Sequence, residues 1–75
     1  MSQDEISQRS NYINCLYISV ELVDLQVRKA DKAVDLINLK RYLIDLMSEI
    51  IIQKKIINAD YQNDQATIER LLSLD

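Results

Sequence analysis

Acidic side chains are the residues of this sequence that could carry out chemistry. The 75-residue chain has no histidine and one cysteine, so acid–base catalysis at neutral pH would have to use carboxylates. Paired carboxylates can hold a metal ion or act as acid and base, but the same spacing is typical of solvated helix faces and caps. Because a thin helical protein offers no pocket to tune a carboxyl group, we expect structural roles for them. Three pairs have the i,i+4 spacing of one helix face: Asp31/Asp35, Asp45/Glu49 and Asp60/Asp64.

The remaining reactive groups are equally few. Cys15 is the only thiol, so one chain can form neither an internal disulfide nor a Cys/His zinc site. It lies on an apolar line with no histidine to activate it, which predicts a buried packing role. The chain also lacks glycine for a phosphate-binding loop and the Glu-x-x-His motifs of helical di-iron sites. We therefore predict a protein that is not an enzyme and has no cofactor and no metal site.

The composition predicts helices. The chain contains neither glycine nor proline, and tight β-hairpins need such residues at positions with unusual backbone angles. Both residues are unfavourable inside helices, so their absence favours long helices with few turns. Apolar residues make up 48% of the chain and charged residues 28%, which is too apolar for intrinsic disorder. The expected fold class is all-α, with residues 1–75 forming a single helical domain.

A first helix is expected over about residues 4–29. Ser2 and Glu5 have the spacing of a capping box, and residues 1–10 are the part that can fray. Residues 23–28 alternate between apolar and polar types as a strand would, but a helix explains more of the pattern. Because a second apolar line lies on another side, this helix should have neighbours on two sides. The main stripe is Ile6, Ile13, Leu16, Val20, Val23, Val27 and Ala30, and the second line is Cys15, Ile18, Leu22 and Leu25.

A second helix is expected over about residues 32–58 and a short third one over 64–74. Residues 58–64 are dense in side chains that bond their own backbone, which predicts a loop. Asp64 would then cap the third helix. Its inward residues would be Ala66, Ile68, Leu71 and Leu72. The stripe of the second helix is Leu36, Leu39, Leu43, Leu46, Ile50 and Ile57, with Met47 beside it.

The connection between the first two helices allows two architectures. A turn at residues 29–32 gives two helices of similar length, as an antiparallel helical hairpin requires. The first apolar stripe nevertheless continues in phase through Val34 and Ile37, which fits one long helix in an intermolecular coiled coil. The stripe loses phase at Arg41, and this favours the break. We therefore expect a hairpin with a short third C-terminal helix, with the continuous helix as the alternative.

The charge pattern argues against nucleic acid and membranes as partners. The net charge is −3 and the isoelectric point about 4.8, whereas nucleic-acid binders carry basic patches. A ribbon-helix-helix protein with residues 16–28 as the ribbon would present Glu21 and Asp24, which have the wrong sign for DNA. Charges interrupt the most apolar stretches, and Asp4 and Glu5 stand where a signal peptide would be basic. We expect no membrane span, no signal peptide and a reduced, cytoplasmic protein.

An excess of apolar surface is the feature that points to function. Ile50, Ile51 and Ile52 cover about 200° of a helix at 100° per residue, and Ile52 stands on a face that is otherwise polar. Tyr17 likewise stands on an otherwise polar face of the first helix. The third helix could fold back over Ile51 and Ile52, or these residues could meet another chain. The residues we predict at a partner interface are Tyr17, Ile51, Ile52, Ile56 and Leu71.

The sequence therefore predicts a small, non-enzymatic protein–protein interaction module. It would self-associate or pack onto a helical partner, since short chains with spare apolar faces usually associate. A small acidic chaperone or adaptor for a secreted or assembling subunit is a second interpretation. A small regulator associated with nucleic acid is a third, although the charge argues against it.

Overall fold

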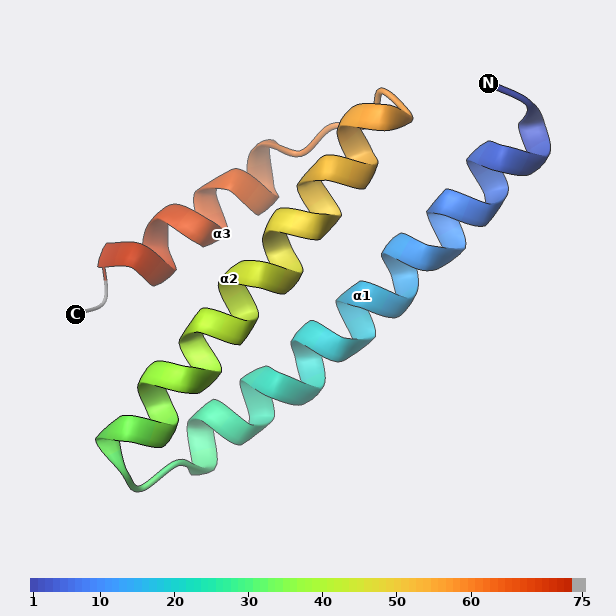
Figure 1. Cartoon of the computed structure of the whole chain (residues 1–75). Coiled ribbons are helices and arrows are strands. Elements are labelled where there is room, and N and C mark those ends of the chain that lie inside the picture. Colours follow the sequence, from blue (N-terminus) through green and yellow to red (C-terminus); the bar gives the residue numbers. More distant parts are fainter. Residues whose placement is uncertain (74–75) are drawn as a thin grey trace.

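Three helices form an elongated layer in the computed structural model, which describes residues 1–73. Helix α1 spans Gln3–Lys29, α2 spans Ala33–Ile56 and α3 spans Gln62–Ser73. Figure 1 shows α2 in the middle, antiparallel to α1 on one side and to α3 on the other. The molecule measures 46 × 20 × 13 Å. The predicted all-α hairpin with a short third helix is confirmed, and the alternative of one continuous helix is wrong because the chain reverses at residues 30–32.

Local sequence explains both ends of α1. The Oγ of Ser2 accepts a hydrogen bond from the backbone N–H of Glu5 at 3.2 Å, which satisfies one of the free donors of the first turn. Asp4 and Glu5 stand at the positive end of the helix dipole, and Arg28 and Lys29 stand at the negative end. The segment that we expected could fray, residues 1–10, is helical from Gln3 onward.

The end of α2 uses an asparagine where many proteins use glycine. Asn58 has φ of 59°, the left-handed conformation that closes a helix. Its N–H donates to the carbonyl of Lys55, and the N–H of Ala59 donates to that of Lys54 at 2.8 Å. Asparagine tolerates this conformation better than other residues with a Cβ, so a chain without glycine can still make the turn.

Helix α3 begins two residues earlier than predicted. The Oδ1 of Asp60 accepts a hydrogen bond from the N–H of Gln62 at 3.0 Å, so Asp60 and not Asp64 serves the start of this helix. Asp64 lies inside the first turn and is buried. Ala66 and Leu72, which we predicted to point inward, are exposed. The predicted end at Leu74 lies outside the described residues.

The core lies along both sides of α2. On the side of α1, Ile13 and Leu16 pack with Met47 and Ile50, and Ile50 is completely buried. Ile68 of α3 packs against the same cluster, which therefore joins all three helices. The buried apolar residues among residues 1–73 are Ile13, Leu16, Val23, Leu43, Met47, Ile50 and Ile51, and the partly buried ones around the central cluster are Tyr17, Val20, Leu46, Ile57 and Ile68.

We predict that Ile50→Ala lowers the free energy of unfolding by about 3 kcal/mol, because it leaves a cavity at the centre of a small core. The matched control is Ile52→Ala, two residues along the same helix, whose side chain is 51% exposed. Urea unfolding followed by circular dichroism at 222 nm measures both. Equal losses for the two variants would contradict the packing described here.

Candidate partner-binding surface

A buried polar cluster ties the three helices together. Tyr17 of α1 donates a hydrogen bond from its hydroxyl to Oδ1 of Asp64 on α3 at 2.5 Å. Lys54 of α2 donates from Nζ to Oδ2 of Asp64 at 2.7 Å and to the Tyr17 hydroxyl at 2.6 Å. The Asp64 side chain is only 5% exposed and that of Lys54 18%, so the ion pair is shielded from water. Such a pair is strongly directional and needs all three partners in place.

The cluster shifts the pKa values of two of its members. Burial raises the pKa of the Tyr17 hydroxyl above 10.0, and its hydrogen bond to the Asp64 carboxylate acts in the same direction. Burial alone would lower the pKa of Lys54, but the hydrogen bonds and charges of Asp64 and Tyr17 together raise it above 10.5. At neutral pH the cluster therefore holds a neutral phenol and a charged ammonium. This arrangement is structural, because no side chain in it remains unpaired.

The five predicted interface residues divide into two groups. Tyr17 is half-buried within the polar cluster, and Ile51 is only 6% exposed, so both side chains are used inside the chain. Ile51 lies seven residues after Ile44, on the side of α2 where α3 packs, which explains its burial. Ile52 and Ile56 remain 51% and 40% exposed, because α3 packs on a different side of α2.

Leu71, the fifth of these residues, is partly buried on α3. It stands beside Leu72, and the two line a shallow depression with Ile37 and Ile44 of α2. Helix α3 is about 18 Å long and α2 about 36 Å at 1.5 Å per residue, so α3 covers only part of the length of α2. The partner-contact role of all five residues stays a prediction.

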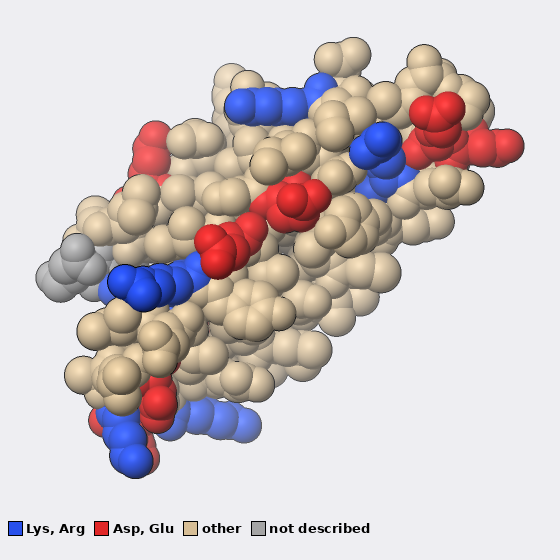
Figure 2. Space-filling view, viewed as in Figure 1, with Lys and Arg blue, Asp and Glu red and all other residues tan. Residues whose placement is uncertain are grey.

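The outer side of α1 carries a line of exposed apolar residues. Ile18, Leu22 and Leu25 are 57%, 57% and 52% exposed, and the Cys15 thiol is exposed with them. We call these four residues the outer stripe. The expected buried role of Cys15 is wrong, because the side of α1 that carries it faces away from α2. Figure 2 shows the edge of the molecule formed by α1 without charged atoms along its middle and with charged atoms at its ends.

The sequence pattern reveals the outer stripe but does not mark it as the interface. The apolar line predicts a neighbour on that side of the helix, whereas Tyr17 and Ile52 are predicted at the interface because each interrupts a polar face. Three helices provide too few neighbours for every apolar side. Helix α2 takes the only position with helices on two sides, and within residues 1–73 no helix packs on the outer side of α1.

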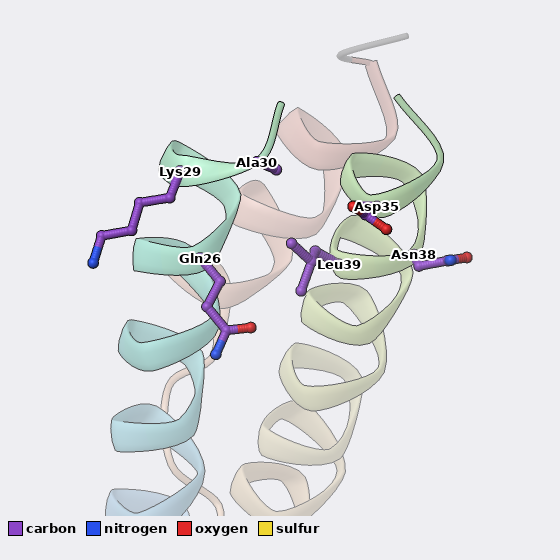
Figure 3. Close-up of a pocket in the computed structure, with 6 residues that line it drawn as sticks. All are labelled: Gln26, Lys29, Ala30, Asp35, Asn38 and Leu39. Atoms are coloured by element: carbon purple, nitrogen blue, oxygen red, sulfur yellow. The ribbon is translucent and has the colours of Figure 1, made fainter. Parts of the chain in front are cut away.

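Open grooves lie between the helices. One, of about 420 Å³, lies between the C-terminal turn of α1 and the first turns of α2. Figure 3 shows that Lys29 and Asn38 point away from each other at its two margins and that Leu39 extends toward α1. A catalytic site would need several polar groups directed at one point. The Lys29 and Asn38 side chains do not meet this requirement, because they point apart.

A second groove, of about 390 Å³, lies between α1 and α3 with α2 as its floor. The floor is apolar and includes Leu43 and Met47. The charged residues at its rim are Glu21, Asp24, Arg28 and Arg70. Arg28 contacts Asp24 at 3.2 Å, and Arg70 donates to the Thr67 hydroxyl.

The carboxylate pairs considered for chemistry are dispersed. Asp31, Asp35 and Asp45 are exposed, and Glu49 accepts a hydrogen bond from Gln53 at 2.8 Å. Among residues 1–73, no three acidic or cysteine side chains come close enough together to hold a metal ion. None of the helices within this part of the chain has the length and apolar character needed to cross a membrane.

Comparison with protein families, with curated proteins and with solved structures finds no match to this chain. The functional argument therefore depends on the surface of the molecule.

We predict that the protein loses stability in alkali as pH rises above about 10. The folded state holds protons on Tyr17 and Lys54 that the unfolded chain releases from pKa values of 10.0 and 10.5. Because the folded state then binds more protons, the free energy of unfolding falls as pH rises. Urea unfolding at pH 7 to 11 should show a plateau to pH 9 and a decline above pH 10. Tyr17→Phe should show a shallower decline, and identical slopes would contradict the assignment.

We also predict that Asp64→Asn lowers the free energy of unfolding by about 2 kcal/mol, because it leaves the Lys54 ammonium shielded without its counter-charge. The matched control is Glu69→Gln, which removes the same charge from an exposed position of α3. Thermal unfolding at pH 7 compares the two. If the control were as destabilised as Asp64→Asn, net charge and not the ion pair would be responsible.

Proposed function

We propose that this protein is a non-enzymatic interaction module that binds a helical partner through the outer stripe of α1. The observation that supports the proposal is the line of four exposed apolar residues, Cys15, Ile18, Leu22 and Leu25, which no charged residue interrupts. The stripe follows the axis of a 27-residue helix, a shape that matches another helix.

Apolar burial would supply the driving force for this association. Removing apolar surface from water contributes roughly 25 cal/mol per Å². Ile18 and Leu22 expose more than half of their surface. A partner helix packed along them would therefore bury more apolar area than it could on a surface of alternating apolar and charged residues. Contiguous apolar patches of this kind are typical of protein–protein contact sites.

The exposed apolar residues of α2 are a weaker alternative surface. Ile52 and Ile56 lie one turn apart, but the positions that continue their line toward the start of the helix carry Asp45 and Glu49. A partner helix there would have to cover carboxylates. We therefore place the main contact on α1 and regard Ile52 and Ile56 as a secondary patch.

The distribution of charge supports a protein partner over nucleic acid. Of the two lysine clusters, Lys54/Lys55 has one member committed to the buried pair with Asp64. The other, Lys29/Lys32, stands beside Asp31 and Asp35 at the turn of the hairpin. We also propose a reducing, cytoplasmic location, in which the exposed Cys15 thiol would remain unpaired.

The test compares two substitutions with nearly equal exposure. Leu22→Asp changes a side chain that is 57% exposed on α1, and Ile52→Asp changes one that is 51% exposed on α2. Because neither residue belongs to the core, helicity should be largely preserved in both. We expect the wild-type molar mass, measured by light scattering across a concentration series, to rise above 8.8 kDa. Leu22→Asp should shift the midpoint of that rise at least tenfold higher in concentration, and Ile52→Asp should shift it little.

Two other outcomes contradict the proposal, and a third would mean that the helical partner is a different protein. If Ile52→Asp alone dissociates the protein, the interface lies on α2. If neither substitution changes the midpoint, the outer stripe takes no part in association. If the wild type is a monomer at every concentration, the outer stripe does not bind a second copy of the chain.

A further inference from the structure

We infer that the partner of the outer stripe is a second copy of this chain, with the two α1 helices packed antiparallel about a two-fold axis midway between Ile18 and Leu22. This inference rests on the proposed function and adds the identity and orientation of the partner. It is argued from the spacing of the stripe, from its symmetry under reversal and from the charges at the ends of α1.

The stripe has the spacing of a helix–helix seam. Residues 11, 15, 18, 22, 25 and 29 are separated by alternating steps of four and three, the heptad spacing that keeps one side of a helix facing a partner. The inner four are apolar. The outer two, Asn11 and Lys29, are polar and exposed, so they mark both ends of the apolar contact.

The pattern is self-complementary when one helix is reversed. With the axis between Ile18 and Leu22, Ile18 of each copy lies opposite Leu22 of the other, and Cys15 lies opposite Leu25. Every apolar residue then meets an apolar residue, and Asn11 meets Lys29, whose ammonium can donate to the amide oxygen. A two-fold interface requires this property, because one patch must complement itself.

The charges at the ends of α1 favour the antiparallel orientation. The first turn carries Asp4 and Glu5, and the last turn carries Arg28 and Lys29. A parallel pair would place the acidic turns side by side and the basic turns side by side, with the helix dipoles also aligned unfavourably. An antiparallel pair separates like ends, and it is the only orientation in which the two dipoles attract.

Glu21 gives the interface a feature that can be tested. It is exposed and precedes Leu22, so it lies beside the axis, where the two copies bring their Glu21 carboxylates near each other. This like-charge contact weakens the dimer. The apolar part of the stripe, from residue 15 to 25, is also only about 15 Å long at 1.5 Å per residue. Both features predict a reversible, concentration-dependent dimer.

The first experiment uses Cys15 as a probe of orientation. In the antiparallel dimer the two Cys15 residues are ten positions apart along the axis, about 15 Å, which is beyond the reach of a disulfide. Leu25→Cys places a new thiol opposite Cys15 of the other copy. Diamide takes up the two protons and two electrons of each thiol pair as a disulfide forms. We expect Leu25→Cys to become covalently dimeric at least tenfold faster than wild type.

The matched control is the double variant Cys15→Ser/Leu25→Cys, in which the remaining thiols are again about 15 Å apart and should cross-link slowly. Fast cross-linking of the wild type through Cys15 would show a parallel pair and would overturn the orientation while leaving the proposed function intact. If a dimer forms that depends on the outer stripe but no variant cross-links, then pairing of the two α1 helices would be overturned in both orientations. A wild-type monomer would overturn the second copy as the partner.

A mixing experiment tests the axis independently. In the antiparallel dimer, Glu21→Lys chains mixed with wild-type chains bring opposite charges together beside the axis. Native mass spectrometry should then show the mixed dimer well above its statistical share of one half, and more so at low salt. In a parallel pair, position 21 lies beside Gln26 of the other copy, and the mixed dimer should appear at the statistical share. That result would contradict the two-fold axis proposed here.

Discussion

Helix α2 packs against a helix on each side, and the rest of the molecule depends on that position. Its side toward α1 buries Met47 and Ile50, and its side toward α3 buries Ile51. The other two helices have no comparable support, since α1 and α3 meet through side chains alone within residues 1–73. Among the described residues, helix α2 contributes four of the seven buried apolar residues, Leu43, Met47, Ile50 and Ile51. Its central position therefore determines which sides of α1 and α3 remain exposed.

Apolar packing alone would let α3 slide along α2, because it has little directionality. The hydrogen bonds among Tyr17, Lys54 and Asp64 are directional, and they determine where α3 stops along α2. Each comes from a different helix, and the distances of 2.5 to 2.7 Å leave little freedom in the position of α3. A charge pair shielded from water is unfavourable unless it is fully bonded, so the cluster opposes any other register of the third helix.

The same arrangement connects structure with function. A layer in which α2 is central leaves α1 covered on one side only, and its opposite side carries Ile18 and Leu22. Within the described part of the chain, residues 1–73, no three acidic or cysteine side chains come close enough together to hold a metal ion. What the molecule does present is a line of exposed apolar residues along α1, and we propose that this line binds another helix.

The sequence by itself determined the fold class and most of the core. The absence of glycine and proline required helices, the loss of phase at Arg41 indicated the hairpin, and the stripes containing Ile13, Leu16 and Ile50 are the ones buried. These features follow from local periodicity, which a single helix displays without its neighbours.

Only the tertiary structure decided which of several apolar sides found a neighbour. Periodicity identified two apolar sides on α1 and could not tell that the one with Cys15 and Leu22 would stay exposed, since this depends on how many helices surround it. The role of Asp64 was also hidden, because its partners Tyr17 and Lys54 are 47 and 10 residues away. Contacts between residues distant in sequence leave no trace in local spacing, so they appear only once the chain has folded.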